Sequence, residues 1–87
     1  MFTTTVVHPY SNEIEKLEKF NQEKITALHE FRAGLLTSEE AATQQVEYDH
    51  SNNQKTIVRY WPSQEIAQQY VDYIISNFDV TSAVVNA

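Results

Sequence analysis

The chain has 87 residues, no cysteine, one glycine and a formal net charge of −6. This length makes one domain, small enough that covering part of its surface with a partner would stabilise it. The missing cysteines exclude disulfides, thiolate metal sites and a cysteine nucleophile, and a lone glycine excludes glycine-rich phosphate loops. An acidic chain without a basic cluster argues against nucleic acid and anionic membranes as partners. No apolar run could span a bilayer and no signal-peptide pattern opens the chain, so a cytoplasmic location is expected.

The first part of the chain predicts a strand followed by a long helix. Residues 2–7 are rich in Thr and Val, which favour a strand, and Pro9 ends it. Ser11 is then a candidate N-cap, and apolar residues recur at helical spacing after it. The helix is expected to run to about Ala33, with Gly34 as its C-terminal stop.

The middle of the chain predicts a helical turn and a β-hairpin. Thr37 and Glu40 have the spacing of a capping box, so a short helical turn is expected there. Residues 44–50 alternate between polar and apolar, which indicates an edge strand with one wet face. Residues 51–54, Ser-Asn-Asn-Gln, are expected to turn the chain into a partner strand over residues 55–61.

The last part predicts a strand-to-helix junction and a final strand. Pro62 breaks the strand, and Ser63 caps an amphipathic helix that should end near Asn77. The apolar residues of this helix form two adjacent rows, Ile66, Tyr70, Ile74 and Phe78 in one, and Ala67, Val71 and Ile75 in the other. Residues 80–85 supply the final strand.

This order of elements predicts an α+β domain with a ferredoxin-like βαββαβ fold over residues 1–87. Short connections and right-handed crossovers give a four-stranded antiparallel sheet with both helices on one face. Neither face of the strand at 55–61 is polar throughout. One face carries Thr56, Val58 and Tyr60, and the other carries Ile57, Arg59 and Trp61. Apolar area on both faces favours a homodimer formed through the sheet, and the alternative is a semi-polar face open to water.

The junction RYWPSQE, from Arg59 to Glu65, resembles the strand-to-helix junction of the dimeric α/β-barrel superfamily. The antibiotic-biosynthesis-monooxygenase-like group is the best known of that superfamily, and the order of elements is similar over nearly the whole chain. The resemblance implies two protomers packed sheet to sheet, with helices outside and, in some members, a ligand cavity. It also implies activities that range from cofactor-independent oxidation of quinol-like aromatics to haem degradation, or none known. The chain departs from the family in its long first helix, its TSEEAAT turn and the lack of an evident haem-ligand or His–Asn–Trp set.

Arg59 is the strongest single candidate for a functional residue. It lies mid-strand in the least polar part of the chain, and a buried arginine needs an anionic or hydrogen-bonding partner. One interpretation is an anchor for a carboxylate or phenolate ligand in a cavity between helices and sheet. The other is a structural ion pair, with Glu47 across the hairpin as the candidate partner, or a pair at an interface.

Aromatic and histidine side chains complete the candidate ligand-binding set. Tyr48, Tyr60 and Trp61 belong to an aromatic-rich half of the chain, which suits either an aromatic ligand or a core and interface. His8 and His50 lie at predicted strand ends, where a cavity mouth could form and a general base could act. The spacing of the histidines predicts no metal site, and the sequence indicates no cofactor.

Three functions are compatible with these residues. The first is a homodimer that binds a small apolar or aromatic acid, without catalysis, through Arg59 and the two strand tyrosines. The second is a cofactor-independent monooxygenase-like enzyme that uses His8 or His50 with Trp61. The third is a structural module whose sheet face recognises another protein.

Overall fold

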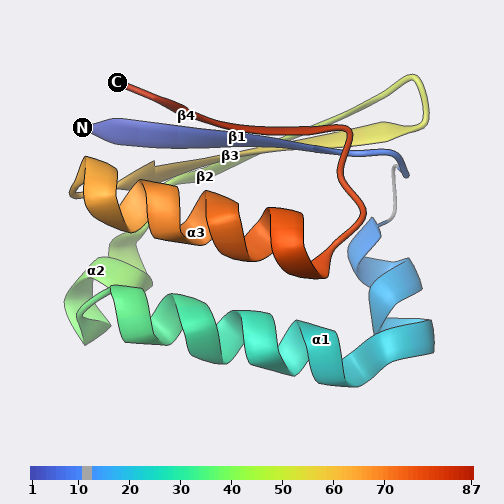
Figure 1. Cartoon of the computed structure of the whole chain (residues 1–87), viewed down its shortest axis with the longest axis horizontal. Helices are drawn as coiled ribbons and strands as arrows, with labels where there is room; N and C mark the ends of the chain where they lie inside the picture. The colour runs from blue at the N-terminus through green and yellow to red at the C-terminus, as the bar shows by residue number, and fades with distance from the viewer. Residues whose placement is uncertain (11–12) are drawn as a thin grey trace.

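The computed structural model describes residues 1–10 and 13–87, with the side chains of 13–15 and 17–20 left undescribed. Its elements are β1 (Phe2–His8), α1 (Glu13–Leu35), α2 (Ser38–Thr43), β2 (Val46–Ser51), β3 (Gln54–Trp61), α3 (Gln64–Asn77) and β4 (Ser82–Asn86). Figure 1 shows α1 and α3 on the same side of the sheet. The short helix α2 lies between α1 and β2 in the chain, where the capping box predicted a helical turn.

The sheet has the strand order β2-β3-β1-β4, and every neighbouring pair is antiparallel. Strands β1 and β3 lie side by side at the centre, because each is followed by a helix that crosses the sheet before the chain returns to it. The domain is therefore α+β and ferredoxin-like in shape, which confirms the predicted order of elements and the predicted sheet.

Burial along β1 and β3 separates the two faces of the sheet. We call the side covered by the helices the inner face, and the side that neither long helix covers in Figure 1 the open face. The inner face carries Thr4, Val6, His8, Lys55, Ile57, Arg59 and Trp61, all buried. The open face of the same strands carries Thr3, Thr5, Val7, Thr56, Val58 and Tyr60, all partly exposed. The buried face thus holds the charged residues, and the exposed face holds none on these two strands.

The core lies between the inner face and α3. Its buried residues are Val6, Leu36, Trp61, Ala67, Tyr70, Ile74 and Phe78. Ser63 caps α3 as predicted, because its hydroxyl accepts a hydrogen bond from the backbone N–H of Ile66 at 3.2 Å. Ala67 and Val71 of the predicted second apolar row are buried, but its last member, Ile75, is 55% exposed. It follows Ile74, which faces the sheet, and one residue turns a helix by about 100°.

Helix α1 is interrupted and ends later than predicted. Asn21 has φ −159° and ψ 59°, which is not helical, so the helix kinks there; Figure 1 shows its first segment turned away from the rest. Gly34 lies inside the helix rather than at its stop, and its φ is not positive. Packing of Leu35 against the core and burial of Leu36 hold this last turn. The predicted N-cap, Ser11, falls outside the described residues.

The β2–β3 hairpin turns through two asparagines. Asn52 and Asn53 have φ of 53° and 59°, and Ser51 pairs with Gln54 across the turn. Asparagine adopts positive φ more readily than most residues, and two such residues in succession match the twist of the flanking strands. The predicted turn is confirmed, and each strand extends one residue further into it than expected.

The capping box of α2 leads to a stability prediction. The hydroxyl of Thr37 accepts from the backbone N–H of Glu40 at 3.1 Å, and the Glu40 carboxylate accepts from the Thr37 N–H at 2.9 Å. Thr37→Ala is expected to lower the free energy of unfolding by about 1 kcal/mol, measured by urea denaturation, because a helix N–H loses its acceptor. Thr43→Ala, at the other end of α2, removes a hydroxyl that donates to Glu39 and should change stability less. Equal losses in the two variants would show that the cap is not the cause.

Candidate functional site

Two cationic side chains of β3 are buried on the inner face. Lys55 and Arg59 are 8% and 6% exposed, because the strand alternation that buries Ile57 and Trp61 buries them too. His8 pairs with Lys55 across the β1–β3 ladder and is 5% exposed. Burying a cation is costly unless it is paired or hydrogen-bonded, so the contacts of these side chains decide what the region can do.

Arg59 meets a neutral phenol rather than a carboxylate. Its Nε donates a hydrogen bond to the Tyr70 hydroxyl at 3.1 Å, and its guanidinium lies 5.9 Å from the centre of the same ring. The predicted ion pair with Glu47 is wrong. Glu47 pairs in register with Val58, which puts it on the open face, and its carboxylate accepts from the Tyr60 hydroxyl at 2.8 Å. Arg59 and Glu47 thus point to opposite sides of the sheet.

Helix α1 brings a third cation, Arg32, to the same region. Its Nη2 donates to Oε1 of Gln44 at 2.8 Å, and Nε2 of Gln44 donates to the carbonyl of Tyr60 at 3.2 Å. This chain of hydrogen bonds ties Arg32 to the backbone of β3 next to Arg59. The Nε of Arg32 is buried and has no hydrogen-bond partner within the described part of the chain. Burial, and then the charge of Arg59, lower the pKa of Arg32.

Arg32 is a functional candidate that was not predicted, although the sequence carries a signal for it. Arg32 follows Leu28 by four residues and precedes Leu35 by three, and both leucines pack against the core. It therefore occupies a position in the apolar stripe of the helix. A cation in an apolar pattern is the same signal that identified Arg59 in β3.

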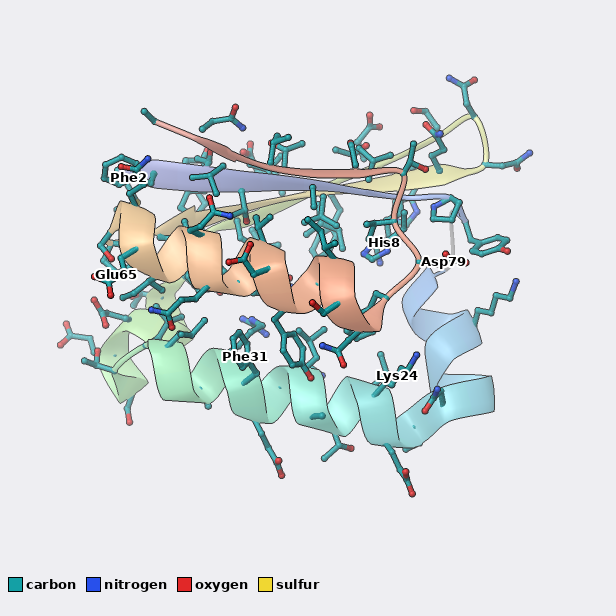
Figure 2. All side chains as sticks on the ribbon, in the orientation of Figure 1. Phe2, His8, Lys24, Phe31, Glu65 and Asp79 are labelled. Carbon is teal, nitrogen blue, oxygen red and sulfur yellow. The ribbon has the colours of Figure 1, made fainter. Side chains whose placement is uncertain are left out.

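Lys55 and His8 extend the cationic region towards the hairpin end of the sheet. The Lys55 ammonium lies 4.9 Å from the centre of the Tyr48 ring. Nδ1 of His8 is 3.4 Å from the carbonyl of Asp79, and Figure 2 shows His8 on the helix side of the sheet near Asp79. Burial lowers the pKa of His8; the Asp79 carbonyl raises it, and Lys55 and Arg59 lower it further. Neutral His8 is thus favoured beside these cations.

The structure brings most of the predicted site residues to one part of the inner face. Arg59 and His8 are buried there, and Tyr48 and His50 share that face of the edge strand β2. Tyr48 pairs with Ile57 and is 52% exposed; His50 is exposed and pairs with Lys55. His8 is the last residue of β1 and His50 lies next to the end of β2, as predicted, and the register places both beside Lys55 at the same end of the sheet.

Trp61 and Tyr60 are not part of this group. The β1–β3 ladder runs from the pair Phe2–Trp61 to the pair His8–Lys55, which separates Trp61 from His8 by about 20 Å along the strands. Trp61 is fully buried in the core, where its indole N–H donates to the Thr4 hydroxyl at 2.9 Å. Tyr60 lies on the open face, where its hydrogen bond to Glu47 raises the pKa of its hydroxyl.

The cations are concentrated here although the chain is acidic. Arg32, Lys55 and Arg59 are half of the six lysines and arginines, against twelve acidic residues. Among the described residues, the arginine side chains donate to the neutral groups of Gln44 and Tyr70, and Lys55 faces an aromatic ring. The described side chains thus form a positive region without a carboxylate of their own. Such groups bind carboxylates or phenolates through charge-assisted hydrogen bonds.

A separate recess of about 210 Å³ lies between α2 and the end of β3. Leu36, Tyr60 and Pro62 contribute to its lining. Glu40 also lines it, and the Glu40 carboxylate is already bonded in the capping box of α2. This recess offers no cation to an acidic ligand, so the inner-face cations are the better candidate site.

No family model, curated protein or solved structure matches this chain. Among the side chains that the structure describes, no group of three or more potential metal ligands is placed to hold an ion. None of the described helices combines the length and apolar character needed to cross a bilayer. Inference about function therefore starts from the inner-face cations.

Proposed function

We propose that this protein is a homodimer that binds a small apolar or aromatic acid on the inner face of each sheet. The supporting observation is the group Arg32, Lys55 and Arg59, whose described partners are all neutral. Burying cations without a counter-charge is unfavourable. A bound carboxylate supplies that counter-charge and accepts hydrogen bonds that the described residues leave unmade.

The side chains beside the cations suit the apolar body of such a ligand. Tyr48 is half exposed on the edge strand, and its register partner Ile57 is buried next to Arg59 on the same face. Aromatic and aliphatic walls around a few placed polar groups are the usual composition of a small-molecule site. Arg59 is then the anchor and Tyr48 a wall of the site. Tyr60, expected to be a second polar contact, lies on the other face of the sheet and is not included in the proposed site.

The homodimer is proposed from the open face of the sheet. Its described residues on β1, β3 and β4 carry no charge, and Glu47 and Asp49 are confined to the edge strand β2. Those uncharged residues are Thr3, Thr5, Val7, Gln54, Thr56, Val58, Tyr60, Ser82, Val84 and Asn86. A self-complementary face depleted of charge suits a symmetric partner. Sheet-to-sheet pairing would relate this chain to the dimeric α/β-barrel superfamily, which its strand-to-helix junction resembles.

The catalytic alternative gains no support from the geometry. It requires His8 or His50 to act together with Trp61, and the register of the ladder places them at opposite ends of the sheet. Trp61 is also committed to the core through its hydrogen bond to Thr4. Ligand binding without catalysis therefore has the stronger basis.

Native mass spectrometry of the purified protein tests the proposal directly. The expected species is a dimer with additional mass that is lost on denaturation, corresponding to a bound small acid. A dimer without additional mass, combined with no binding of benzoate in solution, would contradict ligand binding. A monomer at micromolar concentration would contradict the proposed assembly.

Replacing the anchor should separate binding from folding. In the double variant Arg59→Met with Tyr70→Phe, both members of the buried hydrogen bond become apolar groups of similar size. We expect benzoate affinity to fall by about 10- to 100-fold, because a charge-assisted hydrogen bond is lost. The free energy of unfolding without ligand should change by less than about 1 kcal/mol or rise, since apolar replacement of a buried ion is often neutral or stabilising. Calorimetric titration and urea denaturation measure the two quantities.

Tyr70→Phe alone is the control for this experiment. It keeps the cation, so benzoate affinity should stay within a few-fold of the unmodified protein. An unfolded double variant would show that Arg59 is needed for the fold. A folded double variant with unchanged affinity would show that Arg59 is not the anchor.

A further inference from the structure

We propose that Arg32 is a second anchor, and that Arg32 and Arg59 together hold one carboxylate of an aromatic acid between α1 and β3. This inference rests on the proposed function. It adds which two residues hold the carboxylate of the ligand, and that one of them comes from α1. Its starting point is the contrast between the two nitrogens of Arg32. Nη2 is hydrogen-bonded to Gln44, whereas Nε is buried and unpartnered within the described part of the chain.

The position of the Arg32 guanidinium is fixed although one of its donors is unused. Gln44 holds it from one side and is itself bonded to the backbone of β3 at Tyr60. The five donors of a guanidinium lie in one plane, so the hydrogen bond to Gln44 restricts the direction in which Nε–H can point. A buried charged donor without an acceptor costs free energy, so an acceptor supplied by a ligand would be strongly favoured there.

The two arginines also form a like-charge pair. Gln44 bonds both Arg32 and the carbonyl of Tyr60, the residue after Arg59, and the charge of Arg59 lowers the pKa of Arg32. The described hydrogen-bond partner of Arg59 is the Tyr70 hydroxyl, which brings no counter-charge to either arginine. Two neighbouring cations removed from water are unfavourable unless an anion lies between them. A carboxylate has two oxygens, one for each guanidinium.

Helix α1 brings Arg32 to β3, where Gln44 bonds both the Arg32 guanidinium and the Tyr60 carbonyl. The helix packs on α2 and α3 more than on the strands. Phe31, the residue before Arg32, stacks on Tyr73 of α3 with ring centres 4.1 Å apart and planes 11° apart, and Figure 2 shows Phe31 directed towards α3. This stack holds the helix while the Arg32 side chain extends to Gln44. A ligand bound to both arginines would therefore link α1 to the sheet.

The donors favour a carboxylate over a phosphate. Both are planar guanidinium groups, whose geometry matches the two oxygens of a carboxylate. Phosphate sites commonly use backbone N–H groups in glycine-rich loops or at helix N-termini, and the single glycine of this chain lies within α1. The tyrosines beside the cations, Tyr48 and Tyr70, favour an aromatic body on the acid.

Titration of benzoate into the full chain tests whether Arg32, and its Nε–H group in particular, contacts the ligand. The expected result is that Arg32→Gln weakens benzoate binding at least about tenfold, measured by calorimetry. Lys24→Gln, which removes an exposed cation from the same helix, should change affinity less than about twofold. In the unmodified protein, the Nε–H resonance of Arg32 should shift on addition of benzoate in nitrogen-15 NMR spectra. When Arg32→Gln is combined with the Arg59 and Tyr70 replacements, the loss of benzoate binding free energy should be smaller than the sum of the losses measured separately. The reason is that both arginines bind one carboxylate.

Different outcomes distinguish failure of this inference from failure of the proposed function. If Arg32→Gln binds benzoate normally and the Nε–H resonance does not move, while the Arg59 double variant loses binding, Arg32 is not an anchor and the proposed function stands. If inorganic phosphate displaces benzoate at equal or lower concentration, the carboxylate class is wrong. If the unmodified protein binds no benzoate, both the inference and the proposed function are overturned.

Discussion

Trp61→Ala is expected to lower the free energy of unfolding by about 3–5 kcal/mol, the largest stability loss we predict for this chain. The Trp61 side chain has no exposed surface, and its ring lies 4.7 Å from that of Tyr70 between centres. Its indole N–H is also bonded to Thr4, which is itself fully buried. The substitution removes apolar contacts, opens a cavity and leaves a buried hydroxyl without its donor. Small domains have little stability in reserve, so most of it should be lost.

Urea denaturation followed by far-ultraviolet circular dichroism measures this loss, because Trp61 is the only tryptophan and its fluorescence disappears in the variant. Ile75→Ala is the matched control, since it truncates a large apolar side chain of α3 that is 55% exposed. We expect the control to change stability by less than about 0.5 kcal/mol. All proteins should be compared at one concentration, because dimerisation adds to apparent stability. Similar losses in both variants would contradict the placement of the core.

Val58→Lys is expected to raise the dissociation constant of the proposed homodimer at least about 100-fold, which corresponds to roughly 3 kcal/mol. Val58 lies at the centre of the open face, between Glu47 on one side and Thr5 on the other. In a sheet-to-sheet dimer the added ammonium would be desolvated against the partner, once in each protomer. In the free protomer it would face water beside the Glu47 carboxylate, so the fold should tolerate it. The variant therefore tests the interface more than the protomer.

Sedimentation velocity over a range of micromolar concentrations measures this effect. Gln69→Lys adds the same charge on the exposed surface of α3 and should leave the dissociation constant unchanged. An unmodified protein that sediments as a monomer throughout would refute the homodimer. A Val58→Lys variant that dimerises normally would place the interface elsewhere than the open face.

The two proposals assign different roles to the two faces of one sheet. The open face is partly exposed and rich in Thr and Val, and we assign it to a second copy of the chain. The face that is buried holds the cations, and we assign it to a ligand. A buried cation weakens a small domain unless it is compensated, so the position of Arg32 and Arg59 away from water fits a binding function better than a purely structural one.

Some of the candidate site could be predicted from the sequence, and some could not. Arg59 was identified because a cation interrupts an apolar strand. The strand period of two already placed Tyr60 opposite Arg59, so including both in one site was inconsistent with that period. Arg32 and Tyr70 entered only with the structure, since their contacts with Gln44 and Arg59 join separate elements.

The sequence by itself determined the features that depend on neighbouring residues. The capping box at Thr37, the Asn52–Asn53 turn and the Pro62–Ser63 junction are set by local hydrogen bonds and backbone preferences, and these are read within a few residues. Only the tertiary structure decided the kink at Asn21 and the link of Arg32 in α1 to β3 through Gln44. Those outcomes depend on which surfaces pack together. They cannot be read from neighbouring residues, because the free energy of burial comes from contacts between residues far apart in the chain.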